Sequence, residues 1–192
     1  MVELGVIMLG RRKLVAAAGG TLAATLAGGK GASAALAGIA EKLKWTDPPV
    51  APPEASFVDA EGVSRGLPAF LGRGMVINFW ATWCAPCVAE MPALAALSLA
   101  LAPHDIAVLP LSSDRGGAAV VSKWYADKGL TALPVLLDPK GAMARAWGVR
   151  GLPTTVIIDR QGRDVARLEG AADWAGPDVV AVIRGLMERA ER

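Results

Sequence analysis

The sequence feature that most constrains the fold is an apolar strand that leads through a short turn into two cysteines and a helix. The strand is expected over 75–80, the cysteines are Cys84 and Cys87, and the helix is expected over 84–102. Residues three apart lie on one face of a helix, so the two sulfurs can reach each other. Free N–H groups and the helix dipole favour a thiolate at this end, where Pro86 is tolerated in the first turn. The spacing predicts a dithiol that opens and closes.

The two cysteines are predicted to have different roles. Cys84 is interpreted as the exposed nucleophile, whose thiolate attacks a disulfide to form a mixed disulfide. Cys87, one turn into the helix, is interpreted as the thiol that resolves it. A structural disulfide is the alternative, but a bridge closing so short a loop constrains the unfolded chain little. Binding of Cu(I) by the two thiolates is a further alternative.

Two motifs resemble the thioredoxin family. The stretch F-W-A-T-W-C-A-P-C at 79–87 is similar to the thioredoxin signature, and G-V-R-G-L-P-T-T at 148–155 resembles the segment whose cis-proline faces the disulfide. The resemblance covers roughly 56–190. It implies an α/β thioredoxin fold with a central mixed sheet flanked by helices, and a cis bond between Leu152 and Pro153.

The same resemblance implies a substrate-binding surface around the dithiol. Pro153 would offer neither an N–H nor a thiol to the reactive sulfur, and the backbone of Leu152 would pair with an extended substrate strand. Trp83 is expected to be a partly exposed docking surface. The residues expected at this surface are Trp83, Ala85, Pro86, Leu152, Pro153 and Thr154.

Glu90 follows Cys87 by one helical turn and is a candidate catalytic residue. A carboxylate there can take the proton of Cys87 or change the pKa of its thiol. ResA-like proteins have a glutamate at the matching position, whereas thioredoxins keep a buried aspartate on the strand where this chain has Asn78. This departure favours the TlpA/ResA branch, and the signature and C-terminal stretch resemble TlpA in particular. A solvated helix charge is the alternative interpretation of Glu90.

The rest of the pattern predicts alternating strands and helices. Weak alternation over 56–67, around a turn at 59–62, predicts a small hairpin or edge strand before the core. Strands are expected over 106–112, 135–137, 154–159 and 164–169, and helices over 117–128, 140–147 and 177–190. A hairpin turn is expected at 159–162. The N-terminal strand addition and the inserted helix 117–128 resemble the TlpA/ResA branch.

Several residues outside the motifs are predicted to have structural roles only. Phe79 and Trp80 alternate on the strand and are expected in the core, on opposite faces of the sheet. His104 and the pair Asp114–Arg115 are interpreted as polar surface. Four more tryptophans are interpreted as packing residues: Trp45, Trp124, Trp147 and Trp174.

The N-terminus is typical of a targeting segment. Residues 11–13 are basic, 14–29 are uncharged, and Ala32-Ser33-Ala34 resembles a cleavage site. Residues 1–34 are therefore predicted to be a signal peptide or an N-terminal membrane anchor, with a twin-arginine signal as a variant of the first. Residues 35–55 are predicted to be a flexible proline-rich linker, and 56–192 a thioredoxin-like domain. The domain would lie on the periplasmic side of the bacterial envelope.

Taken together, the residues and the resemblance predict an exported thiol–disulfide oxidoreductase that reduces protein disulfides. The resemblance implies substrates among copper-centre factors of cytochrome oxidase or apocytochrome c, and electrons from a membrane thiol carrier. No cofactor is expected, and one histidine with two cysteines cannot build a four-ligand zinc site. The charge pattern gives no indication of nucleic-acid binding. A disulfide-forming oxidase and a Cu(I) carrier remain the alternatives.

Overall fold

The structure is a computed structural model and describes residues 38–190. An eight-stranded sheet is its frame, with the strands in the order β1-β8-β7-β4-β5-β6-β2-β3. The strands are β1 Lys44–Val50, β2 Ser56–Asp59, β3 Ser64–Gly66, β4 Gly74–Trp80, β5 Ile106–Ser112, β6 Leu136–Leu137, β7 Thr154–Ile158 and β8 Asp164–Glu169. The helices are α2 Ala85–Leu101, α3 Gly117–Lys128, α4 Ala142–Ala146 and α5 Val179–Ala190, with short 3₁₀ turns η1 Leu67–Phe70 and η2 Ala102–His104.

Strand β4 lies at the centre of the sheet and leads directly into the cysteines. It runs parallel to β5 and antiparallel to β7, which makes the sheet mixed. Every residue of β4 is buried, so both of its faces are covered. A strand covered on both faces is expected to be continuously apolar, and β4 departs from this only at Asn78.

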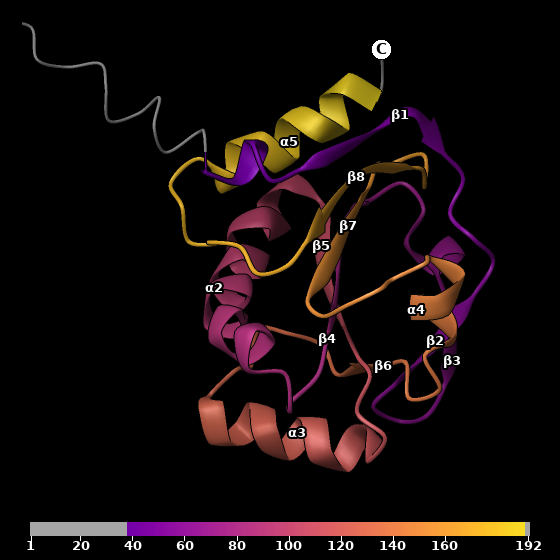
Figure 1. Cartoon of the computed structure of the whole chain (residues 1–192), viewed down its shortest axis with the longest axis vertical. Helices are drawn as coiled ribbons and strands as arrows, with labels where there is room; N and C mark the ends of the chain where they lie inside the picture. The colour runs from indigo at the N-terminus through magenta and orange to yellow at the C-terminus, as the bar shows by residue number, and fades with distance from the viewer. Residues whose placement is uncertain (1–37, 191–192) are drawn as a thin grey trace, which may run out of the picture.

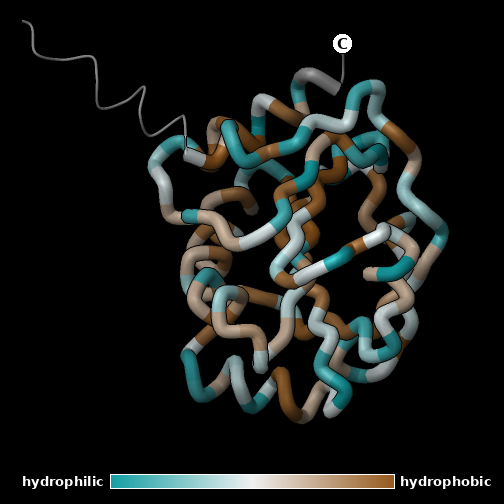
Figure 2. Tube along the Cα trace, in the orientation of Figure 1, coloured by the Kyte–Doolittle hydropathy of each residue, from teal (hydrophilic) through white to brown (hydrophobic). Residues whose placement is uncertain are grey.

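Two apolar layers cover the two faces of the sheet. Trp80 belongs to the layer that contains Cys87 and the buried residues of α2, α3 and α5. Phe79 belongs to the opposite layer, where it packs edge-on against Trp147 with ring centroids 5.6 Å apart. Figure 1 shows α2 and α4 on opposite sides of the strands, and Figure 2 shows hydrophobic residues concentrated along the central strands. The predicted mixed sheet, inserted helix and opposite-face core residues are confirmed.

The linker predicted over 35–55 is wrong where the chain forms β1. Residues Lys44–Val50 pair antiparallel with β8. Thr46 Oγ1 donates a hydrogen bond to Asp164 at 2.9 Å, and Lys44 bridges Glu169 at 2.7 Å. Pro48 and Pro49, two of the four prolines that suggested a linker, lie on this edge strand, where a missing N–H is tolerated. Trp45 on this strand is 50% exposed, so it is only half buried and is not part of the core.

The membrane-related predictions fall on the N-terminus. Residues 1–34, predicted to be a signal peptide or anchor, lie outside the described residues. Within 38–190, the one helical stretch long and apolar enough to cross a membrane is Ala85–His104, which is α2 with η2. Its apolar residues Cys87, Met91 and Leu94 are fully buried against the sheet. Core packing therefore accounts for part of the hydropathy of this helix, while its Leu99 is exposed.

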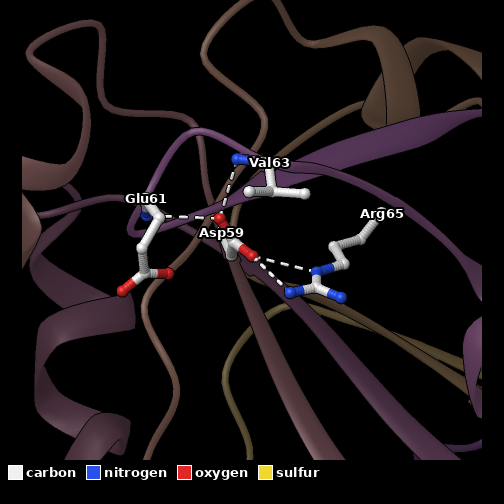
Figure 3. Close-up of polar contacts among 4 residues, drawn as sticks. All are labelled: Asp59, Glu61, Val63 and Arg65. Atoms are coloured by element: carbon white, nitrogen blue, oxygen red, sulfur yellow. Dashed lines mark hydrogen bonds and ion pairs between the residues drawn. The ribbon is translucent and has the colours of Figure 1, made fainter.

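The predicted early hairpin is formed by β2 and β3, and β2 pairs with β6. Figure 3 shows how Asp59 closes its turn: the carboxylate accepts hydrogen bonds from Val63 N at 2.8 Å, Glu61 N at 3.2 Å and Arg65 Nε at 2.9 Å. Desolvation raises the pKa of Asp59, but the hydrogen bonds from Val63 and Arg65 and the Arg65 charge together hold it below the usual value. The hairpin thus extends the sheet beyond β6.

Candidate active site

Cys84 and Cys87 form a disulfide at the N-terminus of α2. Cys84 is the N-cap residue, the S–S distance is 2.08 Å, and the two Cα atoms are 5.3 Å apart. Cys87 is fully buried, while Cys84 is 7% exposed. The expectation of an exposed Cys84 is therefore wrong for the disulfide form, although Cys84 is the more accessible of the two. The predicted placement of both sulfurs at a helix N-terminus is confirmed.

The turn between β4 and Cys84 is held by a buried carboxylate. Thr82 donates to Asp114 from its backbone N at 2.9 Å and from its Oγ1 at 2.6 Å, and Ser112 Oγ donates to the same carboxylate at 2.7 Å. Asp114 is 4% exposed, so its interpretation as solvated surface is wrong. Its sequence signal was its place directly after β5, because parallel neighbours β4 and β5 end at the same edge of the sheet.

A groove of about 610 Å³ opens beside Cys84. Trp83 lines it with 70% of its surface exposed, so the predicted exposure is confirmed, whereas its docking role stays a prediction. The residues that line the groove are Trp83, Cys84, Pro86, Ser113, Ala144, Val149, Arg150, Gly151 and Leu152. The lining is mostly apolar, and Arg150 is its one charged residue.

The segment directly before β7 shares the groove with Cys84, since Gly151 and Leu152 line it as well. The bond between Leu152 and Pro153 is cis, as predicted. A smaller hollow of about 280 Å³ continues from the groove and is lined by Pro153 and Thr154. The structure thus brings together five of the six predicted surface residues around these two hollows. The sixth, Ala85, is exposed at the start of α2 without lining either.

Glu90 is buried, with 5% of its surface exposed. Its Oε1 accepts a hydrogen bond from Asn78 Nδ2 at 2.9 Å, and its Oε2 accepts from Ala172 N at 3.1 Å and Trp174 Nε1 at 3.0 Å. Burial raises the pKa of Glu90 above its usual value, and the three hydrogen bonds offset this only in part. The alternative of a solvated helix charge is therefore wrong.

Asn78 connects Glu90 to the strand that follows the cis-proline. Its Nδ2 also donates to Thr155 Oγ1 at 3.0 Å, while its Oδ1 has no partner among the described residues. A polar network thus joins β4, α2 and β7 inside the apolar core. Trp174 belongs to this network, which the interpretation of Trp174 as a packing residue missed. The pairing joins residues 84 apart in sequence, and no local pattern indicates it.

This arrangement of strand, dithiol helix and cis-proline segment agrees with the comparisons to known proteins. The profile of the AhpC/TSA family matches residues 50–164. The chain belongs to the AhpC/TSA family. The match covers β4, the dithiol, β5, the inserted helix α3 and the cis-proline segment.

Curated relatives of this AhpC/TSA chain are named as thiol–disulfide oxidoreductases. It is 32% identical over 118 residues to the thiol-disulfide oxidoreductase ResA of Bacillus thuringiensis, which covers 62% of this chain and 67% of the relative. It is 31% identical over 111 residues to the ResA of Geobacillus thermodenitrificans, covering 58% of this chain and 63% of that relative. The chain thus spans about two thirds of the length of these relatives.

Solved structures share the fold. The exposed lipoprotein thioredoxin Etrx1 of Streptococcus pneumoniae is 27% identical, with a TM-score of 0.57 over 70% of this chain and 98% of that one. A secreted thiol-disulfide isomerase of Corynebacterium glutamicum is 22% identical, with a TM-score of 0.64 over 77% of this chain and 92% of that one, which shows the fold alone. The predicted thioredoxin fold is confirmed.

Proposed function

We propose that this protein is an exported thiol–disulfide oxidoreductase that reduces disulfides of other exported proteins. The observation that supports this most directly is the Cys84–Cys87 disulfide at the N-terminus of α2, beside an open groove. The names of the ResA relatives agree with this activity.

The proposed reaction transfers two electrons from the dithiol to the partner. The Cys84 thiolate attacks the partner disulfide, forms a mixed disulfide and releases the first partner thiolate. Cys87 then attacks the Cys84 sulfur, releases the second partner thiolate and leaves the protein disulfide that the structure contains. In this scheme Cys84 is the nucleophile, Cys87 the resolving thiol, and Glu90 the group that accepts the proton of Cys87. A reduced thiol carrier restores the dithiol.

The groove is the proposed binding surface for the partner. Trp83 presents an exposed ring on one side, and the backbone of Leu152 is available on the other. An extended segment around the partner cysteine would lie between them, with further contacts to Pro86, Pro153 and Thr154. Ala85 would border this surface from the start of α2.

The cellular setting is part of the proposal. Residues 1–34 would direct export, and the domain would work on the periplasmic side of the envelope, either free after cleavage or anchored. The described domain would begin at about residue 38 rather than 56, because β1 belongs to the sheet. Partners would be assembly factors of cytochrome oxidase or apocytochrome c, with a membrane thiol carrier as the electron source.

Trapping the partner tests this function. In a Cys87→Ser variant the mixed disulfide on Cys84 cannot be resolved, so exported proteins with redox-active cysteines should accumulate as reducible adducts. The Cys84→Ser variant is the matched control and should capture none. Equal yields from the two variants, or adducts restricted to abundant bystander proteins, would contradict the proposal.

A further inference from the structure

The loop that follows β8 is built against the buried carboxylate of Glu90. It starts at Gly170, whose backbone N donates to the carbonyl of Pro153 at 2.9 Å. It then places the backbone N of Ala172 and the indole Nε1 of Trp174 on the same oxygen of Glu90, at 3.1 Å and 3.0 Å. One short loop thus connects the cis-proline to Glu90.

Trp174 is buried in the same layer as Cys87 and has 2% of its surface exposed. A buried indole N–H usually has a hydrogen-bond partner, and here the partner is a carboxylate. The other two contacts on Glu90 are also N–H donors, from Asn78 and Ala172. A set made only of donors fits the ionised form of the carboxyl group, since a protonated one would need an acceptor.

We propose that Trp174 is a positioning residue for the dithiol exchange, whose indole N–H holds the Glu90 carboxylate ionised and fixed one helical turn from Cys87. This inference rests on the proposed function, because Glu90 is the group that would accept the proton of Cys87. Trp174 acts through Glu90 and does not itself contact the sulfurs in the proposed reaction.

The loop is also held from its outer side. Lys42 Nζ donates to the carbonyl of Ala171 at 3.3 Å, next to the first contact of Glu90. Ile39 and Leu43 of the same segment are buried in the core layer that contains Trp174. Residues 38–43 therefore help to hold the loop in place, and with it the N–H groups of Ala172 and Trp174 that donate to Glu90.

Few other charged or titratable groups act on Glu90. Asn78 and Thr155, from β4 and β7, do not titrate, and α2 contributes the thiol of Cys87. Asp173 of the loop is exposed and accepts a hydrogen bond from Ala175 N at 3.1 Å, while Lys42 is engaged by Ala171. Among the described residues, no charged side chain contributes to the shifted pKa of Glu90, which burial raises and the three donors lower.

The Trp174→Phe variant tests the inference because it keeps an aromatic ring and removes the N–H donor, and the buried volume it also removes is matched in the control. The matched control is Trp147→Phe, since Trp147 is also buried but its indole N–H has no partner among the described residues. The first measurement follows the Glu90 carboxyl carbon by NMR against pH in the disulfide form, where the cysteines do not titrate. The titration midpoint should move to higher pH in Trp174→Phe and stay at the parent value in Trp147→Phe.

The second measurement is single-turnover oxidation of the reduced proteins by oxidised glutathione across pH. Trp174→Phe should lower the rate about tenfold at about pH 5, where more of the Glu90 carboxyl group would be protonated than in the parent. It should leave the rate unchanged at about pH 8, where Glu90 would be ionised in both proteins. In a Glu90→Gln background, Trp174→Phe should have no further effect on the pH profile, because the carboxylate through which it acts is gone.

An unchanged NMR midpoint in Trp174→Phe would overturn the inference, as would a pH shift that persists in the Glu90→Gln background. Failure of the proposed function gives a different result. If the dithiol were only a structural disulfide, the reduced parent protein would not exchange with oxidised glutathione, and if the protein were a disulfide-forming oxidase, exchange would persist at a higher reduction potential. In both cases the NMR titration would still report on the indole contact.

Discussion

At the scale of single residues, Cys84 and Cys87 differ in their positions on α2 and in their exposure. Cys84 caps α2 and lines the groove, whereas Cys87 lies inside the helix and is fully buried. Because Cys84 is at the N-cap, the free N–H groups and the helix dipole stabilise its thiolate more strongly than that of Cys87. We therefore propose a defined order for the exchange reaction, in which Cys84 attacks the partner disulfide and Cys87 resolves the mixed disulfide.

Alkylation of the reduced protein tests this order. Iodoacetamide at neutral pH should modify Cys84 at least about tenfold faster than Cys87, because only Cys84 combines access with thiolate character. Peptide mass spectrometry over a time course measures both rates. Equal rates, or faster modification of Cys87, would remove Cys84 as the nucleophile.

Glu90→Gln tests the buried carboxyl group through stability. Burial raises the pKa of Glu90 above the ordinary value of 4.5, so the folded state binds this proton more tightly than the unfolded state. Stability from this group is present below the ordinary pKa and is lost as pH rises through the raised folded pKa. A glutamine at this position does not titrate, so the variant does not lose stability in this way as the pH rises. Its free energy of unfolding relative to the parent should therefore increase as pH rises through that window.

Denaturant titrations of both proteins at several pH values measure this difference. Glu188→Gln is the matched control, because Glu188 is an exposed helical glutamate whose pair with Arg184 spans 3.9 Å. Glu188→Gln should change stability by no more than about 0.5 kcal/mol. A pH-independent difference for Glu90→Gln would show that burial does not perturb this carboxyl group.

At the scale of elements, the turn of residues 81–83 depends on Asp114 from the neighbouring strand end. Its carboxylate receives two hydrogen bonds from Thr82 and one from Ser112, and an amide in its place removes the negative charge that strengthens all three. Asp114→Asn should lower the free energy of unfolding by about 1–3 kcal/mol and also lower the rate of disulfide exchange.

Denaturant unfolding and glutathione oxidation measure the two effects of Asp114→Asn. The control is Asp127→Asn, which breaks an exposed ion pair with Lys123 on α3 and should change neither quantity appreciably. If Asp114→Asn loses stability but exchanges at the parent rate, Asp114 supports the fold without positioning the turn.

The hairpin β2–β3 does not contribute to the groove beside the dithiol, and its stability can be tested separately at Asp59. Since the pKa of Asp59 lies below its usual value, the stability it contributes is present above the unfolded pKa and is lost as pH falls through the folded pKa. Asp59→Asn should remove this acid sensitivity and speed hydrogen exchange at Glu61 and Val63, whose N–H groups it accepts. Exchange in β4 should stay unchanged. Faster exchange across the whole sheet would contradict a local role.

Some elements could be predicted from the sequence because their signals are local. Strand β5 and helix α3 have the predicted bounds, 106–112 and 117–128, since each is a continuous pattern with a turn at its end. Strand β1 was missed because its prolines resemble a linker, and only its pairing with β8 makes it a strand. Asp114 and Trp174 were misread because their partners, Thr82 and Glu90, lie 32 and 84 residues away.

At the scale of the whole molecule, the fold places three separate segments around one reactive bond. The β4–α2 turn supplies the disulfide, the segment directly before β7 supplies the cis-proline, and the loop after β8 donates hydrogen bonds to Glu90. The comparisons agree with this arrangement, because the family profile matches residues 50–164, which include the dithiol and the cis-proline. The direction of electron flow is the property that separates a reductant from a disulfide-forming oxidase.

The reduction potential of the Cys84–Cys87 couple tests that direction most directly. It is measured by equilibrating the protein with defined ratios of reduced and oxidised dithiothreitol or glutathione and quantifying the free thiols. A reductant of protein disulfides should have a potential between about −200 and −270 mV, in the range of glutaredoxins and thioredoxin. A value near about −120 mV, as in a strong disulfide donor, would contradict the proposed reductant role.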